Sequence, residues 1–266
     1  MNLSDKVALV TGAAGGIGIE ITRELLKNGI KAVSLLDINE TAGTDILAKL
    51  SDEFSTSQVT FIKADVTDMN ALEDAFKKTI DSFGGLDIVV NNAGIADDRE
   101  YELEINVNFT GILRGTLLGL KYMGKDQQGK GGIILNTASV GAFECQQVIP
   151  VYAGTKAGIL NMSRGFGHPS YYRRTGVKVI VLCPGKTVTE LFTNLEFMMA
   201  NMKESIEIME KMPSQTAEAV GQAAVHAIKH GESSSIWVIN ESKLYQVNIP
   251  SWQTYAQHVV TLNMPQ

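Results

Sequence analysis

The chain is poor in cysteine, because only Cys145 and Cys183 occur among its 266 residues. Two cysteines are too few for a disulfide framework, so we expect a reduced, cytoplasmic protein. The sequence has no run of about 18 apolar residues, which argues against a membrane-spanning helix. Its first segment, Met1–Lys6, also lacks the apolar region of a signal peptide.

The sequence also lacks a basic block, and this argues against one class of partner. With a net charge of −6 and a pI of about 5.3, the chain is not expected to bind nucleic acid. Histidines are few. His226 and His230 share a predicted helix face, but no carboxylate lies between them and no third ligand is evident, so we predict no metal site.

Glycine, in contrast, is concentrated in one early segment. Gly12, Gly16 and Gly18 follow the apolar run Val7–Val10 and precede apolar residues at helical spacing. Glycines at such a strand–helix turn let the backbone approach a ligand, and the helix start favours a pyrophosphate. The spacing is looser than G-x-G-x-x-G, so an ordinary strand–helix turn is the alternative interpretation.

A carboxylate supports the cofactor interpretation. Asp37 ends the second apolar run, about 20 residues beyond the last glycine, where an acidic group can bind the adenosine ribose hydroxyls. The carboxylate would repel a 2′-phosphate, and neither Gly15 nor Ile38 supplies a compensating cation. The predicted cofactor is therefore NAD, the alternative being a solvated aspartate at the end of a strand.

Strand-like and helix-like segments alternate along the whole chain, without a repeat or linker. This alternation predicts an α/β fold, a Rossmann-type doubly wound parallel sheet of about seven strands with helices on both faces. We expect a single domain over residues 1–266, with 186–215 as a candidate substrate lid. The expected strands are Val7–Val10, Lys31–Leu36, Gln58–Lys63, Leu86–Val90, Gly132–Thr137, Val177–Leu182 and Ser235–Ile239. The expected helices are Gly16–Asn28, Glu40–Phe54, Ala71–Phe83, Glu104–Met123, Val151–Tyr171 and Ala217–His230.

Two residues in one predicted helix suggest acid–base chemistry. Tyr152 and Lys156 are four positions apart, so their side chains can meet on one helix face. An ammonium beside a phenol favours the phenolate, so we expect Lys156 to lower the pKa of Tyr152. Alone, this spacing is common on helix surfaces and carries little weight.

Together these features resemble the short-chain dehydrogenase/reductase family over nearly the whole chain. Within that family the sequence is similar to 15-hydroxyprostaglandin dehydrogenases and to insect-type short-chain alcohol dehydrogenases, both NAD-dependent. The matching residues are Thr11, Gly12, Gly16, Gly18, Asp65, Asn91–Gly94, Asn108, Ser139, Tyr152, Lys156, Pro184 and Gly185.

The resemblance implies a role for each catalytic position. Tyr152 would be the general base in alcohol oxidation, and Lys156 would lower its pKa and bind the nicotinamide ribose. Ser139 would hold the substrate oxygen, while Asn108 would anchor a water that relays protons. The resemblance and the strand-end pattern together predict cofactor contacts from Gly12, Gly15, Gly16, Ile17, Gly18, Asp37, Ile38, Asp65, Val66, Asn92, Ala93, Gly94, Tyr152, Lys156, Pro184, Gly185, Thr187 and Thr189.

Substrate contacts are predicted from the loops that follow the later strands. Prostaglandin dehydrogenases typically carry a glutamine three residues before the tyrosine, whereas this chain has Ile149, which argues against a prostaglandin substrate. Residues 191–212 are rich in methionine and are predicted to form either a mobile apolar lid or a static core helix. The predicted substrate residues are Ser139, Gln146, Gln147, Ile149, Phe192, Leu195, Met198, Met199 and Met202.

We therefore predict an NAD-dependent dehydrogenase that interconverts an apolar or lipid-like alcohol and its carbonyl product. The enzyme alternative is a prostaglandin, steroid or isoprenoid alcohol dehydrogenase, and the non-enzyme alternative is a dinucleotide-binding sensor or storage protein. The resemblance also implies a homodimer or tetramer formed through Glu104–Met123 and Val151–Tyr171, of which we expect the dimer. Aromatic residues near the C-terminus, Tyr245 among them, could pack on a partner or across the substrate cleft.

Overall fold

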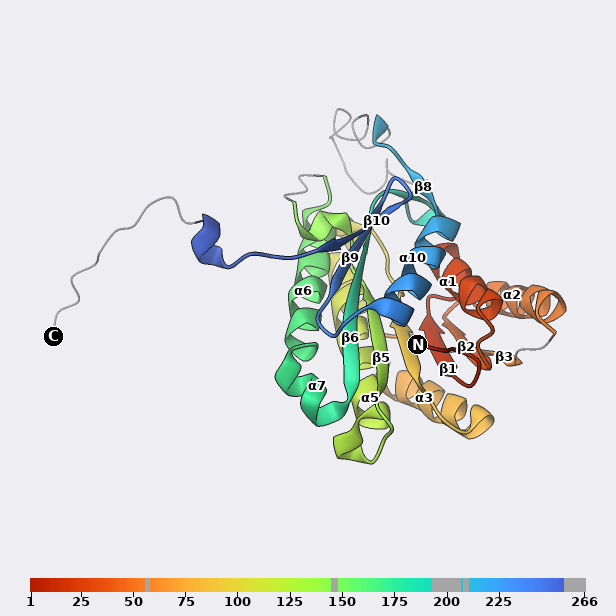
Figure 1. Cartoon of the computed structure of the whole chain (residues 1–266). Coiled ribbons are helices and arrows are strands. Elements are labelled where there is room, and N and C mark those ends of the chain that lie inside the picture. The colour runs from red at the N-terminus through yellow and green to blue at the C-terminus, as the bar shows by residue number, and fades with distance from the viewer. Residues whose placement is uncertain (56–57, 145–147, 193–206, 208–210, 256–266) are drawn as a thin grey trace.

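A twisted sheet of eight strands forms the centre of the computed structural model, which describes residues 1–55, 58–144, 148–192, 207 and 211–255 (Figure 1). Seven strands are parallel, which confirms the predicted doubly wound fold. Their spatial order is β10-β9-β6-β5-β4-β1-β2-β3. The parallel strands are β1 Val7–Thr11, β2 Ala32–Asp37, β3 Gln58–Lys63, β4 Ile88–Asn91, β5 Gly132–Thr137, β6 Val177–Pro184 and β9 Ile236–Asn240.

The eighth strand, β10 (Lys243–Val247), was not predicted and runs antiparallel to β9. The two strands are joined by a two-residue turn, in which Glu241 and Ser242 have φ angles of 50° and 59°. Such turns normally use Asn-Gly or Asp-Gly, and this one lacks glycine, so a hairpin could not be predicted here. A second, small sheet pairs β7 (Thr187–Val188) with β8 (Gln215–Thr216).

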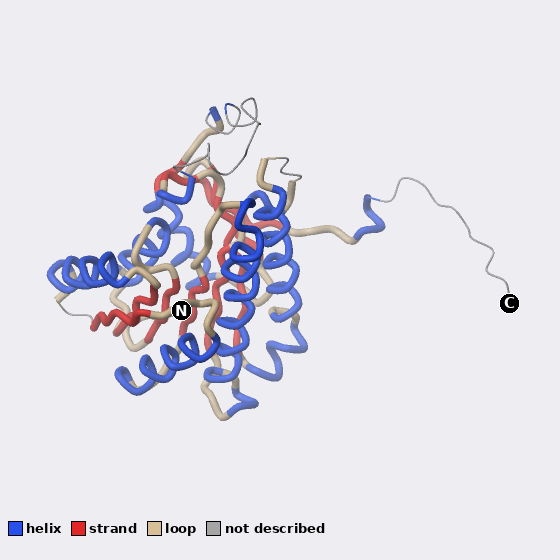
Figure 2. Tube along the Cα trace, turned by 180° about the vertical axis from the view of Figure 1, so that it is seen from behind, coloured by secondary structure: helices blue, strands red, loops and turns tan. Residues whose placement is uncertain are grey.

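Helices cover both faces of the large sheet, as Figures 1 and 2 show from opposite sides. One face carries α1 (Gly16–Lys27), α2 (Glu40–Glu53) and α10 (Ala217–His230), whose buried side chains share one core cluster with the sheet. The other carries α3 (Met69–Phe83), α5 (Ile112–Met123) and α6 (Pro150–Phe166). The central strands are buried on both sides, which explains their continuous apolar runs.

Local chemistry sets the helix boundaries. The Asp68 carboxylate accepts hydrogen bonds from the Asn70 and Ala71 amides, so α3 begins two residues before the predicted Ala71. The prediction of one helix over Val151–Tyr171 was wrong, because α6 ends at Phe166. A separate helix, α7, begins at Pro169, and a proline is tolerated in a first helical turn but not in a helix interior.

The helix predicted over Glu104–Met123 is also divided. The chain forms α4 (Tyr101–Ile105), then a π-helical segment (Asn106–Gly111), and then α5. Each π-helical turn takes an extra residue, and such segments occur mostly at functional sites. Helical periodicity alone does not distinguish this segment from an α-helix.

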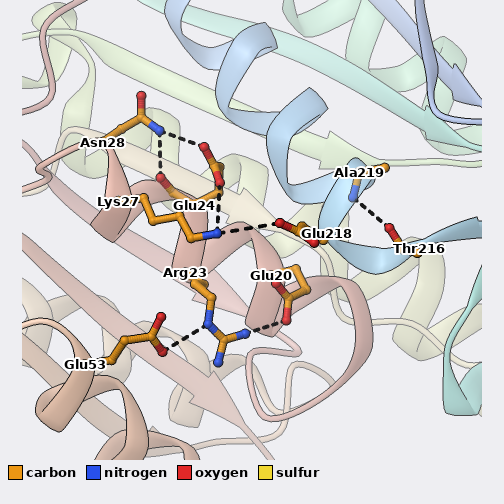
Figure 3. A network of polar contacts seen from close by, with 9 residues as sticks. All are labelled: Glu20, Arg23, Glu24, Lys27, Asn28, Glu53, Thr216, Glu218 and Ala219. Carbon is orange, nitrogen blue, oxygen red and sulfur yellow. Dashed lines mark hydrogen bonds and ion pairs between the residues drawn. The ribbon is translucent and has the colours of Figure 1, made fainter.

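Polar contacts join α1 to its neighbours on both sides (Figure 3). Arg23 binds Glu20 in its own helix and reaches Glu53 at the end of α2, with 3.2 Å between Nε and Oε2. On the other side, Lys27 lies 3.7 Å from Glu218 of α10. These contacts are partly exposed and add little stability, so apolar packing holds α1 against α10.

The described helices include none that is both long and apolar enough to cross a membrane. Beyond β10 the chain leaves the body of the molecule and reaches the short helix η6 (Trp252–Tyr255), which stands apart from the sheet in Figures 1 and 2. This part of the C-terminal segment therefore does not cover the carboxyl ends of the strands.

Candidate active site

A cavity of about 640 Å³ opens at the carboxyl ends of the parallel strands. Ligands bind at this edge in doubly wound folds, because strand order reverses there and leaves a crevice between loops. In this chain the reversal lies between β1 and β4. The predicted site residues on its wall are Gly12, Gly15, Gly16, Ile17, Asp37, Asn92, Ala93, Gly94, Ser139, Ile149, Tyr152, Lys156, Pro184, Gly185, Thr187 and Thr189.

The glycine loop forms one side of this cavity. Gly12 and Gly16 have φ angles of 63° and 50°, a region that L side chains rarely adopt. A Cβ on Gly12 would lie 2.8 Å from the Ala93 Cα, so the ends of β1 and β4 touch here. The Thr11 hydroxyl reinforces this junction, because its Oγ1 accepts hydrogen bonds from the Asn92 and Ala93 amides at 3.0 and 3.1 Å.

Gly18 contributes in a different way, since it packs the start of α1 against the loop and does not line the cavity. A Cβ on Gly18 would lie 2.0 Å from the Gly12 carbonyl oxygen. We therefore expect Gly18→Ala to lower the free energy of unfolding by about 1–3 kcal/mol, as overpacking does. Thermal and denaturant unfolding of the cofactor-free protein measure this loss.

Gly15→Ala is the matched control. A Cβ on Gly15 would meet no atom within 4 Å, and its φ of −157° suits any residue. Its stability should stay within about 0.5 kcal/mol of wild type. Equal losses in the two variants would contradict the packing role of Gly18.

The residues around the glycine loop fit a dinucleotide. Gly15 caps α1 without a side chain, which leaves the first amides of this helix available for a pyrophosphate. Asp37 lies at the end of β2 on the cavity wall, and its Oδ2 accepts a hydrogen bond from the Ala14 amide at 3.0 Å. The carboxylate is thus fixed beside the glycine loop, where a ribose would lie.

Four predicted cofactor residues do not line this cavity. Ile38 is 63 % exposed, and Val66 packs against Gly111 at the end of the π-helical segment. Asp65 turns back to the chain, because its Oδ1 accepts a hydrogen bond from the Thr67 amide at 2.8 Å. Gly18 is the fourth. The contacts of these four residues with a cofactor stay a prediction.

Tyr152 and Lys156 project from α6 into the same cavity and are almost fully buried, with exposed fractions of 6 % and 3 %. The Lys156 Nζ lies 5.4 Å from the centroid of the Tyr152 ring and donates a hydrogen bond to the Thr137 carbonyl at 3.1 Å. Ser139 follows β5, hydrogen-bonds with Tyr152, and accepts the Gly141 amide at 3.1 Å. A phenol, an ammonium and a hydroxyl therefore converge at one end of the cavity.

The expected lowering of the Tyr152 pKa is not found. Burial raises the pKa of Tyr152 to about 12, and the hydrogen bond with Ser139 opposes this only in part. The same burial lowers the pKa of Lys156 to about 8. The i, i+4 spacing thus predicted the proximity of the two groups, but it could not include the cost of placing charges in a closed site.

Asn108 lies within the π-helical segment, fully buried behind the cavity wall. Its amide binds the backbone of Ile95 twice, accepting from N and donating to O, both at 2.8 Å. A Cβ on Gly94 would lie 3.2 Å from Asn108 Oδ1 and 3.4 Å from Lys156 Nζ. Asn108 therefore supports the loop against which Lys156 lies, and its predicted water relay is not tested.

The structure describes only some of the predicted substrate residues. Ile149 lines the cavity, and Phe192 ends the short helix η5 (Glu190–Phe192). Gln146, Gln147, Leu195, Met198, Met199 and Met202 lie outside the described residues. Leu191 and Met212, the two ends of the predicted lid or core segment, line the cavity, and so does Tyr245, for which the substrate cleft was one of two expected places. Tyr245 reaches it from β10, the strand that was not predicted.

A buried polar network behind the site was also not predicted. Asn91 Nδ2 donates to Asn136 Oδ1 at 2.8 Å, and Asn136 Nδ2 donates to Ser163 Oγ at 2.8 Å. These bonds link β4, β5 and α6, and Thr116 of α5 joins them through Asn136. Such networks fix one arrangement of the elements they join, here those that carry Asn108, Ser139 and Tyr152. Within the part of the chain that is described, no group of three metal-ligating side chains occurs.

Comparison with known proteins agrees with this geometry. The short chain dehydrogenase family model matches residues 6–200. The chain is 39 % identical to the rat 15-hydroxyprostaglandin dehydrogenase [NAD(+)] over 80 % of this chain and 79 % of that protein. It is 30 % identical to alcohol dehydrogenase 2 of Ceratitis capitata over 93 % of this chain and 96 % of that protein.

A solved structure confirms the fold independently. The levodione reductase crystal structure superposes with a TM-score of 0.77 at 23 % identity, covering 90 % of this chain and 97 % of that one. The matched family model includes the glycine loop, Ser139, Tyr152 and Lys156, the residues that converge on the cavity. The chain therefore belongs to the short-chain dehydrogenase family.

Proposed function

We propose that the protein is an NAD-dependent dehydrogenase of apolar or lipid-like alcohols. One observation carries the proposal, namely that Tyr152, Lys156 and Ser139 lie in the same cavity as the glycine loop and Asp37. An acid–base group and a dinucleotide site are thereby placed next to each other. The names of the rat and Ceratitis relatives, an NAD(+)-linked hydroxyprostaglandin dehydrogenase and an alcohol dehydrogenase, support this reaction.

In this proposal Tyr152 takes the hydroxyl proton of the substrate during oxidation and returns it during reduction. Ser139, hydrogen-bonded with Tyr152, holds the substrate oxygen within reach of the phenol. Lys156 stabilises the negative charge that the Tyr152 oxygen carries before it takes the proton, and its hydrogen bond to the Thr137 carbonyl fixes the direction of the ammonium. The Lys156 ammonium, which faces the cavity, would also bind the nicotinamide ribose.

The glycine loop and the start of α1 would hold the pyrophosphate of NAD, and Asp37 would hold the adenosine ribose. When bound, NAD⁺ supplies the hydride acceptor. The protein supplies position, exclusion of water, and the proton acceptor.

Apolar side chains contribute to the cavity wall near Tyr152, which supports an apolar substrate. Ile149 and Leu191 pack with Tyr152, and Met212 also lines the cavity, as do the charged residues Glu144, Lys186 and Glu190. Ile149 stands where prostaglandin dehydrogenases typically have a glutamine. It is buried, with 4 % of its surface exposed, and it is the N-cap residue of α6. Prostaglandin, steroid or isoprenoid alcohols remain the alternative substrates, since the 39 % identical rat relative is a prostaglandin dehydrogenase by name.

The formation of NADH from NAD and a panel of alcohols tests this function. In a homologous series of secondary alcohols, each added methylene should improve transition-state binding by up to about 0.8 kcal/mol until the pocket is full. kcat/KM should therefore climb with chain length. NAD binding without turnover of any alcohol would favour the sensor or storage alternative, and a flat trend would contradict the apolar pocket.

Cofactor choice provides a second prediction. Asp37→Asn keeps an acceptor for the Ala14 amide but removes the charge that would bind the ribose and repel a 2′-phosphate. A hydrogen bond to a charged group contributes about 1.5–3 kcal/mol, so NAD affinity should fall roughly 10–150-fold. The preference for NAD over NADP should narrow, as measured by calorimetric titration with both dinucleotides.

The control for this prediction is Asp45→Asn, which removes an exposed carboxylate from α2. It should leave both affinities unchanged. A wild-type protein that binds NADP as tightly as NAD would contradict the role of Asp37.

We further propose a cytoplasmic homodimer. Leu103, Ile105 and Leu117 expose 50 %, 40 % and 45 % of their surface on α4 and α5, in the region predicted as the interface. Exposed apolar residues of this kind favour contact with a second copy. Cys183 is a buried free thiol, which agrees with a reduced compartment.

A further inference from the structure

A pair of acidic residues outside the proposed catalytic set lies against the start of α6, the helix that carries Tyr152. This helix has no cap of its own, because its N-cap residue is Ile149 and its first residue is Pro150. Asp98 of the short helix η1 (Asp98–Glu100) supplies the cap. Its Oδ2 accepts the Val151 amide at 2.7 Å and its Oδ1 accepts the Tyr152 amide at 3.1 Å.

Behind Asp98 lies Glu104 of α4, whose exposed fraction is 0 %. Glu104 Oε1 accepts a hydrogen bond from the Asp97 amide at 3.2 Å. Oε2, although buried, receives no hydrogen bond from any donor of the described residues. Its hydrogen-bonding neighbour is the Asp98 carboxyl, and two carboxyl groups can bond to each other only when one of them carries a proton.

The hydrogen bonds of the two carboxyl groups assign the shared proton to Glu104. Both oxygens of Asp98 accept amides at the positive end of α6, and this arrangement favours a carboxylate. The buried Glu104 receives a single amide, so the proton belongs to Glu104.

We propose that Glu104 is a positioning residue for the reaction: its protonated carboxyl donates from Oε2 to the Asp98 carboxylate and holds it on the Val151 and Tyr152 amides. The proposal rests on the proposed function, in which Tyr152 is the acid–base group. A fixed Tyr152 amide fixes the start of α6 and hence the direction of the Tyr152 phenol. Losing the proton of Glu104 would place two carboxylates in contact and loosen the cap.

The surroundings of Glu104 agree with a proton held at neutral pH. Burial and, after it, contact with the Asp98 carboxyl together raise the pKa of Glu104 to about 8. Asp97 also faces it, but Arg99 binds the Asp97 carboxylate at 2.7 and 2.8 Å. Glu104 is therefore protonated below about pH 8, and above this pH the Glu104 and Asp98 carboxylates repel each other.

Two groups of α6 also face this pair. Tyr152 and Lys156 both interact with Glu104 across the helix interface. An ionised Glu104 would raise the pKa of Tyr152 and so oppose its role as proton acceptor. On the helix of Glu104 itself, Glu102 is exposed and points its carboxylate to the Tyr101 hydroxyl at 3.4 Å.

Amide hydrogen exchange at Val151 and Tyr152 tests the cap directly, in the full chain and without turnover. In the wild type, protection corrected for intrinsic exchange should hold up to about pH 8 and fall above it. Glu104→Gln keeps a donor toward Asp98 and an acceptor for Asp97 but cannot ionise, so its protection should not depend on pH. Glu104→Val removes the donor and should lower protection roughly 2- to 30-fold at every pH, the value of a helix cap.

Kinetics with NAD and an active alcohol then test the positioning role. Glu104→Val should lower kcat while the KM for NAD changes little, because Asp37 and the glycine loop are untouched. Glu104→Gln should keep kcat near that of the wild type and should reduce the loss of kcat expected above about pH 8 to the part that deprotonation of Lys156 causes. Glu102→Gln, on the same helix but exposed, is the matched control and should behave as wild type.

The results of these experiments distinguish the proposed role of Glu104 from the proposed dehydrogenase function. Exchange in Glu104→Gln that follows the wild-type pH dependence overturns the protonated pair, whatever the catalytic result. Altered exchange with an unchanged kcat in Glu104→Val overturns the positioning role. A wild type that turns over no alcohol, but has the expected exchange, refutes the proposed dehydrogenase function and leaves the cap intact.

Discussion

Tyr152→Phe is expected to retain NAD binding and to lose about 10²–10⁴-fold in kcat, the usual contribution of a general acid–base group. Only 6 % of the Tyr152 surface is exposed, and phenylalanine would occupy the same space as the tyrosine ring. Only the hydroxyl that hydrogen-bonds with Ser139 is lost. Initial rates of NADH formation with a saturating alcohol measure the fall, and a calorimetric titration with NAD measures retained binding.

The matched control is Tyr122→Phe, which also removes one phenol hydroxyl. Tyr122 lies on α5, where its hydroxyl donates to Glu73 at 2.8 Å, and it does not line the cavity. Its kcat should stay close to that of the wild type. If Tyr152→Phe stays within about threefold of wild type, general acid–base catalysis by Tyr152 is refuted.

The fold could be predicted well because strands and turns in this chain carry strong local signals. Buried parallel strands read as apolar runs, and every predicted parallel strand is present within two residues of its expected bounds. Glycines with positive φ mark the turn after β1, where the sequence placed the dinucleotide. The carboxyl ends of parallel strands necessarily share one edge, so polar residues there could be assigned to one site.

What could not be predicted depends on contacts between distant parts of the chain. Asp98 caps α6 from 53 residues away, and no spacing within the sequence signals such a pair. The turn at Glu241 and Ser242 adopts positive φ without glycine, so β10 could not be predicted, and the sequence left open whether Tyr245 contacts a partner or the substrate cleft. Burial is likewise a property of the folded chain, and it reverses the expected direction of the Tyr152 pKa.

The raised pKa of Tyr152 determines what Lys156 must do in each direction of the reaction. A phenol whose pKa is about 12 is protonated near neutral pH, which suits the donor role in carbonyl reduction. Alcohol oxidation needs Tyr152 as the phenolate before it accepts the hydroxyl proton, and the ammonium of Lys156, 5.4 Å from the ring centroid, is placed to stabilise that phenolate. At about that distance two unit charges in a medium of effective dielectric constant about 20 attract by about 3 kcal/mol, or roughly 10²-fold in rate.

We therefore expect Lys156→Met to lower kcat/KM for alcohol oxidation by roughly 10²-fold near pH 7. Burial lowers the pKa of Lys156 to about 8, so the wild type itself loses this charge as the pH rises through 8. The gap between wild type and variant should accordingly narrow above about pH 8. Lys121→Met, which removes an exposed lysine bound to Glu73 at 2.7 Å, controls for the loss of one positive charge.

Stability distinguishes a catalytic defect in Lys156→Met from a folding defect. Burial disfavours the charged lysine in the folded chain, and its folded pKa of about 8 lies below the ordinary value of 10.5. The contribution of Lys156 to wild-type stability should therefore rise with pH between these two values, because the unfolded chain still binds the proton there. Lys156→Met should lack this rise and unfold at no lower temperature than wild type near pH 7. Rate profiles whose ratio stays constant across that pH range would show that Lys156 acts through packing alone and would refute its electrostatic role.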